Sequence, residues 1–184
     1  MDSALSACMG TPVIDCPSVR HSIAQRLLQE RPAEVSGSLG MCLLQGVTTN
    51  AKLETLKMLL DAGANVGAVF GDDVQPVTHG TTALHHAVYH CVESHKKDAD
   101  ATYGGEKRSN ADAVVRLLIE RGAPLDVQSR ADLSPLPWRT IVAGSTPRDI
   151  ALACENADVA VAVAAIIDHA VAKRDAARAA LLGA

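Results

Sequence analysis

The stretches that decide the fold are GTTALHHAV at residues 80–88 and AVVRLLIERGAPLDV at residues 113–127. The first predicts a short helix, because Thr82 is a residue type that caps helix starts and a short apolar stripe follows it. The second predicts a longer helix with apolar residues at helical spacing, which ends at Gly122, where glycine can adopt the left-handed turn. Together they predict one helix-turn-helix unit with a large insertion between its helices.

Both halves of this unit recur in the chain. LETLKMLLDAGANVGA at residues 53–68 repeats the second stretch in its leucine pair, the acidic residue after the apolar run and the Gly-Ala doublet. GSTPRDIAL at residues 144–152 repeats the first, with Thr146 as the cap and Pro147 at the first helical position. A unit of this size cannot bury its own apolar face, so recurring copies predict a stack of repeats.

These motifs resemble the ankyrin repeat family, in which a G-x-TPLHxA inner helix is followed by a VVxLLLxxGA outer helix and a β-turn finger. The match is carried by residues 114–123 together with Gly80, Thr82, Leu84, His85 and Ala87. Residues 144–152 keep part of the pattern, although Asp149 stands where the family has histidine. The resemblance covers roughly residues 18–170 and implies an all-α ankyrin-repeat solenoid with β-turn fingers.

The expected organisation is an irregular N-terminal segment over residues 1–17 and an ankyrin-repeat domain over residues 18–184. The domain divides into an N-terminal half-repeat, two repeats, and a C-terminal repeat with its cap, at about residues 18–35, 36–79, 80–143 and 144–184. The helices expected in its first part span residues 18–28, 36–45 and 53–62.

The C-terminal segment, residues 157–182, alternates valine with alanine, as a strand could. The intervening alanines are not polar and alanine is the best helix former, so the segment is predicted to be helical. Its expected inward side consists of Val163, Ile166, Ile167, Ala170 and Val171. Its charged residues are expected to form a solvated cap face: Lys173, Arg174, Asp175 and Arg178.

Three insertions distinguish this chain from a plain repeat array. Residues 67–79 and 128–143 extend the fingers, and long loops of this kind are often functional. Residues 91–111 separate the two helices of one repeat, and their mixed charge without an apolar period predicts disorder.

Composition limits the possible settings and partners. The chain is 48% hydrophobic but only 2% aromatic, which favours a core of small aliphatic side chains. Its net charge of −4 and the lack of a long basic run argue against nucleic acid as the main partner. Five scattered cysteines without a C-x-x-C pair fit a reduced intracellular setting. No signal peptide or apolar run long enough to cross a bilayer is expected, so the prediction is a cytoplasmic protein without membrane contact.

One group of residues has the composition of a metal site: His85, His86, His90, Cys91 and His95. On a continuous helix His86 and His90 lie one turn apart, a spacing that lets two imidazoles reach one metal, with Cys91 or His95 as a third ligand. In the other interpretation, the ankyrin resemblance implies that His85 bonds to neighbouring backbone, and His86 and His90 line the concave face. We favour the second, because structural zinc normally has four ligands, and predict no metal or cofactor.

No catalytic signature appears in the chain, so we predict a binding protein and not an enzyme. The expected partner is another protein, bound by a monomer through its fingers and concave inner-helix face. The predicted contact residues are Phe70, Asp72, Asp73, His86, Tyr89, His90, Trp138 and Arg139. Trp138 either forms a hot spot with Arg139 or folds back over residues 141–142, and Phe70 has the same two options. The alternatives are a metal-binding scaffold that uses His86 and His90, and self-association through the Ala-rich C-terminal helix.

Overall fold

The structure is a computed structural model, and it describes residues 17–30, 39–49, 51–69, 80–94, 111–130, 133–136 and 139–183. The described part is mostly helical, which confirms the predicted helical class, and it contains one two-stranded sheet. Its helices are α2 (Pro17–Glu30), α4 (Leu39–Thr48), α5 (Leu53–Asp61), α6 (Ala83–Ser94), α7 (Ala111–Glu120), α8 (Pro147–Leu152) and α9 (Ala157–Leu182). Its strands are β1 (Leu133–Leu136) and β2 (Arg139–Ile141).

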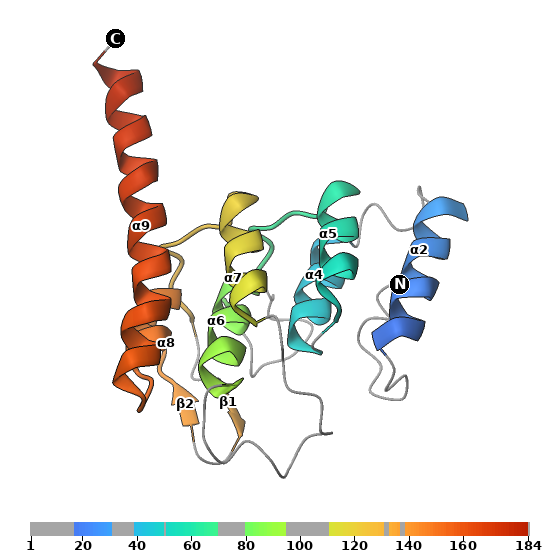
Figure 1. Ribbon diagram of the computed structural model, residues 1–184, viewed down its shortest axis with the longest axis horizontal. Coiled ribbons are helices and arrows are strands. Elements are labelled where there is room, and N and C mark those ends of the chain that lie inside the picture. The colour runs from blue at the N-terminus through green and yellow to red at the C-terminus, as the bar shows by residue number, and fades with distance from the viewer. Residues whose placement is uncertain are drawn as a thin grey trace.

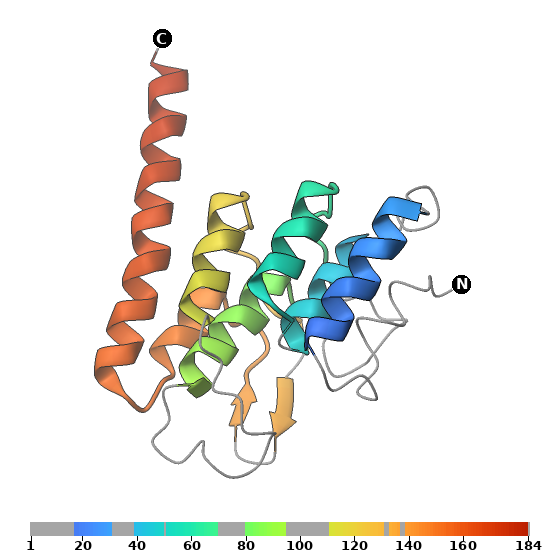
Figure 2. The same cartoon turned by 45° about the vertical axis from the view of Figure 1, so that its right-hand side comes forward.

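The helices stand side by side as successive pairs, α4 with α5, α6 with α7 and α8 with α9 (Figure 1). One row consists of α4, α6 and α8, and each contacts the next. The other row, here called the outer row, consists of α2, α5, α7 and α9, again in contact from one to the next. Turning the molecule by 45° shows the same order, with α2 and α9 at opposite ends (Figure 2). This is the arrangement of a helical-repeat protein, in which each pair buries its apolar face against its neighbours.

The ends of α5 and α7 have the same backbone geometry, as expected of two copies of one unit. Each is followed by a glycine with a positive φ angle, 93° at Gly63 and 82° at Gly122. The amide of the next residue donates to a carbonyl five residues back, at 3.0 Å after Gly63 and 2.9 Å after Gly122. The recurrence seen in the sequence is therefore also a recurrence of structure.

The core runs through the stack and is made of small aliphatic side chains, as the composition predicts. Fully buried leucines come from neighbouring helices: Leu43 and Leu44 on α4, Leu56 and Leu59 on α5, Leu84 on α6 and Leu118 on α7. Burying one leucine side chain contributes roughly 1.5–3 kcal/mol, so neighbouring helices depend on one another for stability. Polar contacts also join α2 to α5, through His21 and Thr55. The segment that follows α7 is joined to α5 through Arg121 and Asp61, and to α9 through Asp126 and Arg174.

Several helix boundaries differ from the sequence prediction. Helix α2 continues to Glu30, two residues beyond the predicted end, and α4 continues past Gln45 to Thr48, because Val47 is still buried in the core. Helix α6 continues to Ser94, so the insertion predicted to begin at Cys91 begins later; Cys91 and Val92 are both buried. Residues 1–16, 70–79 and 95–110 lie outside the described part, and so do the predictions of an irregular N-terminus and of disorder made for them.

The C-terminal segment is one continuous helix, which confirms the choice of helix over strand. Val163 and Ile167 are buried, and Ile166, Ala170 and Val171 pack against the core, as predicted. From residue 172 to residue 183 every side chain is exposed. This last part extends well beyond the ends of α7 and α5 (Figures 1 and 2).

Candidate functional site

The most distinctive surface feature is a β-hairpin between α7 and α8, here called the finger hairpin, residues 133–141. Strands β1 and β2 pair antiparallel, with Leu133 opposite Ile141 and Leu136 opposite Arg139. The hairpin lies within the predicted finger insertion, residues 128–143, and projects from the lower edge of the helices in Figure 1. The prediction of long irregular loops did not include this pairing.

Backbone hydrogen bonds hold the two ends of the hairpin together at what we call the finger base, residues 129 and 142–145. The Ser129 amide donates to the Ser145 carbonyl at 3.0 Å, and the Gly144 amide donates to the Ser129 carbonyl at 2.7 Å. The Ser129 hydroxyl donates to the Val142 carbonyl at 3.1 Å. Ser129 is only 3% exposed, whereas Val142 and Gly144 are exposed, so the bonds are shielded from water at the Ser129 end. Together they fix where the hairpin leaves the body.

His85 links the finger base to α6. The Thr82 amide donates to His85 Nδ1 at 3.1 Å, so Nδ1 is an acceptor and the ring proton lies on Nε2. Nε2 donates to the Ser145 carbonyl at 3.3 Å. Burial lowers the pKa of His85 to about 4, so the ring is neutral at pH 7. The prediction that His85 bonds to neighbouring backbone is confirmed.

Two predicted contact residues on α6 are buried instead of exposed. His86 is 8% exposed and its Nε2 lies 3.0 Å from the Thr81 hydroxyl. Burial, together with the neighbouring His85, lowers the pKa of His86 to about 4. Tyr89 is 6% exposed, and its ring stacks edge-on against His90 at 5.5 Å between centroids. Helix α6 contacts α4, α7, α8 and α9, and the predicted exposure of these side chains on a concave face is therefore wrong.

His90 is half-buried and lines a cavity of about 20 Å³, whose other walls are Val47, Ala51, Leu56, Ala87, Ala111 and Val114. That volume suits about one water molecule and excludes an organic ligand. Within the described ranges, no three His, Cys, Asp or Glu side chains are grouped so that they could hold a metal ion. The Cys91 thiol donates to Asp112 Oδ1 at 2.8 Å, and burial, followed by this carboxylate, raises the pKa of Cys91. His95, the other suggested ligand, lies outside the described residues.

The remaining predicted contact residues belong to the fingers. Phe70, Asp72, Asp73 and Trp138 lie outside the described residues. Arg139 is the first residue of β2, directly after Trp138 in the chain. The structure thus places one predicted finger residue on the hairpin and connects that hairpin to α6 through the finger base.

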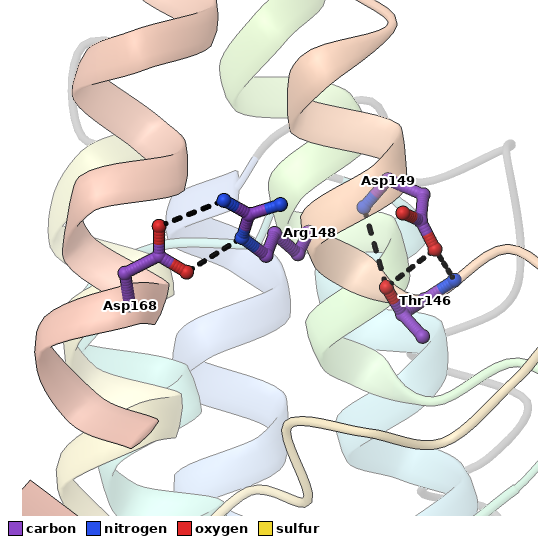
Figure 3. Close-up of polar contacts among 4 residues, drawn as sticks. All are labelled: Thr146, Arg148, Asp149 and Asp168. Atoms are coloured by element: carbon purple, nitrogen blue, oxygen red, sulfur yellow. Dashed lines mark hydrogen bonds and ion pairs between the residues drawn. The ribbon is translucent and has the colours of Figure 1, made fainter. Parts of the chain in front are cut away.

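Thr146 caps the start of α8 and Pro147 is its first residue, as predicted, but the other members of the polar cluster there were not predicted (Figure 3). Thr146 and Asp149 form a capping box, in which the Asp149 amide donates to the Thr146 hydroxyl at 3.3 Å and the Thr146 amide donates to Asp149 at 2.9 Å. The hydrogen bond from the Thr146 hydroxyl is the main cause that lowers the pKa of Asp149. The T-x-x-D spacing would have revealed this box, and it explains why aspartate fits where the resemblance leads one to expect histidine.

In the same cluster, Arg148 donates two hydrogen bonds to Asp168 of α9, at 2.6 and 3.0 Å. These bonds lower the pKa of Asp168, and the pair joins α8 to α9 at the exposed end of the stack. The two residues are twenty positions apart and share no motif, so the sequence gives no signal for the pair.

Comparison with known proteins identifies no relative: no family model, no curated protein and no solved structure matches this chain. Among the helices described, none is long and apolar enough to cross a membrane.

Proposed function

We propose that this chain is an ankyrin-type repeat protein that binds another protein through its finger hairpin and the surface beside the start of α8. The ankyrin assignment is supported by the motif order in the sequence and by the two-row packing of the helix pairs. It is further supported by the shared geometry after α5 and α7. The proposal assigns no catalytic step and no cofactor to the chain.

The observation that carries the binding role is the buried connection between the finger base and α6. A loop that only linked two helices would not require a buried serine bonded to the Val142 and Ser145 carbonyls, or a neutral buried histidine that also bonds the Ser145 carbonyl. Such anchoring reduces the conformational entropy that a projecting loop loses when it binds a partner. Trp138 and Arg139 lie in this loop, and Trp and Arg are enriched among residues that dominate binding energy.

The test is affinity capture from native cell extract followed by titration of the purified partner. Three chains are compared: the wild type, Trp138→Ala, and a variant in which residues 134–140 are replaced by a short Gly-Ser link. The excision spares Ser129 and residues 142–145, because removing them would disrupt the finger base as well as the hairpin. A matched control, Arg26→Ala, alters an exposed residue of α2 at the far end of the stack.

The expected result is a protein that is captured by the wild type and the control and is lost with both finger variants. Truncating a hot-spot tryptophan should weaken binding by at least about 2 kcal/mol, roughly thirtyfold in Kd. All variants must first show the wild-type circular dichroism spectrum. Equal capture by the excision variant and the wild type would remove the finger hairpin from the binding surface.

A further inference from the structure

The C-terminal part of α9 has no counterpart among the other outer-row helices. Helix α9 has 26 residues, against 10 in α7 and 9 in α5. Its last part, residues 172–183 and here called the α9 extension, is exposed at every position. Arg174 connects it to the body through Asp126. Most helical stability in proteins comes from packing of an amphipathic face, so a second surface would stabilise this exposed segment.

One face of α9, from Val171 at its last contact with the core into the extension, carries the features of a helix pair. Val171, Asp175, Arg178 and Leu182 follow one another at spacings of four, three and four residues, which places them on a single face. The two outer members are apolar: Val171 is partly buried where α9 leaves the core, and Leu182 is 79% exposed. The two inner members carry opposite charges. Arg174 lies beside this face and not at its centre, and it is bonded to Asp126 and, at 3.1 Å, to one carboxylate oxygen of Asp175.

The order of these four residues selects one way of pairing two copies. In a parallel pair, Asp175 would face Asp175 and Arg178 would face Arg178, and both contacts repel. In an antiparallel pair centred between Ala176 and Ala177, Asp175 of each copy faces Arg178 of the other. The same alignment places Val171 opposite Leu182 at both ends, and the alanines at the centre let the backbones approach.

We propose that the α9 extension is a self-association site, at which two copies of this chain pair antiparallel through Val171, Asp175, Arg178 and Leu182. The interface is isologous, since the same four residues face each other on both copies. It is also small compared with a standard protein interface, so the dimer is weak and forms only at high protein concentration. The proposal is independent of the binding role of the finger hairpin, which lies on another part of the molecule (Figure 2).

The test measures mass by sedimentation equilibrium, from about 10 μM to about 1 mM protein, a range suited to weak association. Wild-type protein should rise from 19.2 kDa toward twice that mass. Arg178→Asp and Asp175→Arg should each remain monomeric or associate at least about tenfold more weakly, because each places like charges opposite one another. Lys173→Asp, which reverses a charge on the opposite face of the helix, should associate like the wild type.

Two further samples make the test specific for the charge pairing. The double variant Asp175→Arg with Arg178→Asp restores opposite charges across the antiparallel pair, so its association should return to the wild-type level. An equimolar mixture of the two single variants should also associate, since one is entirely acidic and the other entirely basic at these positions. Monomeric wild type throughout the range, single variants that associate like the wild type, or a mixture that stays monomeric would each overturn the proposal.

Discussion

At the scale of single residues, Gly80 lies where the segment that leads into α6 packs against Arg130 at the start of the finger. Its φ angle is 77°, and a Cβ added there would lie 2.5 Å from Arg130 Cγ and 2.8 Å from the Arg130 amide nitrogen. Arg130 directly follows Ser129 of the finger base. Its backbone therefore cannot move away from residue 80 without disturbing the hydrogen bonds that Ser129 makes with Gly144 and Ser145. Glycine is therefore required at residue 80 both for its conformation and for the space it leaves.

Gly63 provides the matched comparison, because its φ angle is 93° but an added Cβ would meet nothing within 4 Å. We expect Gly63→Ala to cost only the strain of a left-handed residue, about 1–2 kcal/mol. Gly80→Ala should cost about 1–3 kcal/mol more, because overpacking adds to the same strain. Urea unfolding of both variants at pH 7 measures the difference. Equal losses of stability would show that Arg130 moves aside at no cost.

At the scale of one element, α6 is a buried helix that carries two neutral histidines. The pKa values of His85 and His86 are lowered to about 4 by burial, whereas in the unfolded chain each is near 6.5. Above pH 6.5 both histidines are neutral in the folded and in the unfolded chain, and their contribution to the free energy of unfolding is fully present. As the pH falls from 6.5 toward 4, the unfolded chain gains protons that the folded chain does not accept, so stability is lost.

The expected loss across this window is about 3 kcal/mol for each histidine. Urea unfolding at several pH values between 7.5 and about 5 should show most of it, above the range in which the carboxylates Asp149 and Asp168 contribute to the pH dependence. His86→Gln keeps a polar group near Thr81 and should reduce the pH-dependent loss by about half. A free energy of unfolding that is constant over this range would contradict the neutral buried state.

How well each element could be predicted from the sequence depends on how far apart in the sequence the residues that determine it lie. Helices α5 and α7 follow from apolar spacing and the glycine after each, which are local signals. The burial of His86 and Tyr89 could not be predicted, because it depends on α4 and α8, which are far away in sequence. The same holds for Arg148 with Asp168, and for Ser129 with Ser145. The finger was predicted as an insertion, but its hairpin depends on strand pairing that residues 128–143 do not signal through alternation.

At the scale of the whole molecule, the stack should not unfold as one unit. Helix α6 packs against four helices, whereas α2 at the end of the stack packs against α5 and is joined to it by the hydrogen bond between His21 and Thr55. In a linear array, stability is a sum of terms between neighbours, so an end element opens at a lower cost than a central one.

Native-state hydrogen exchange with increasing urea should therefore show α6 amides exchanging only through global unfolding, and α2 amides exchanging by local opening at least about 2 kcal/mol lower. His21→Ala removes the polar contact to Thr55 without touching α6, so it should accelerate exchange in α2 and leave α6 unchanged. If α2 and α6 converge on one opening free energy in the wild type, the chain is a single cooperative unit. In that case the polar contacts between outer helices couple the repeats more strongly than nearest-neighbour packing implies.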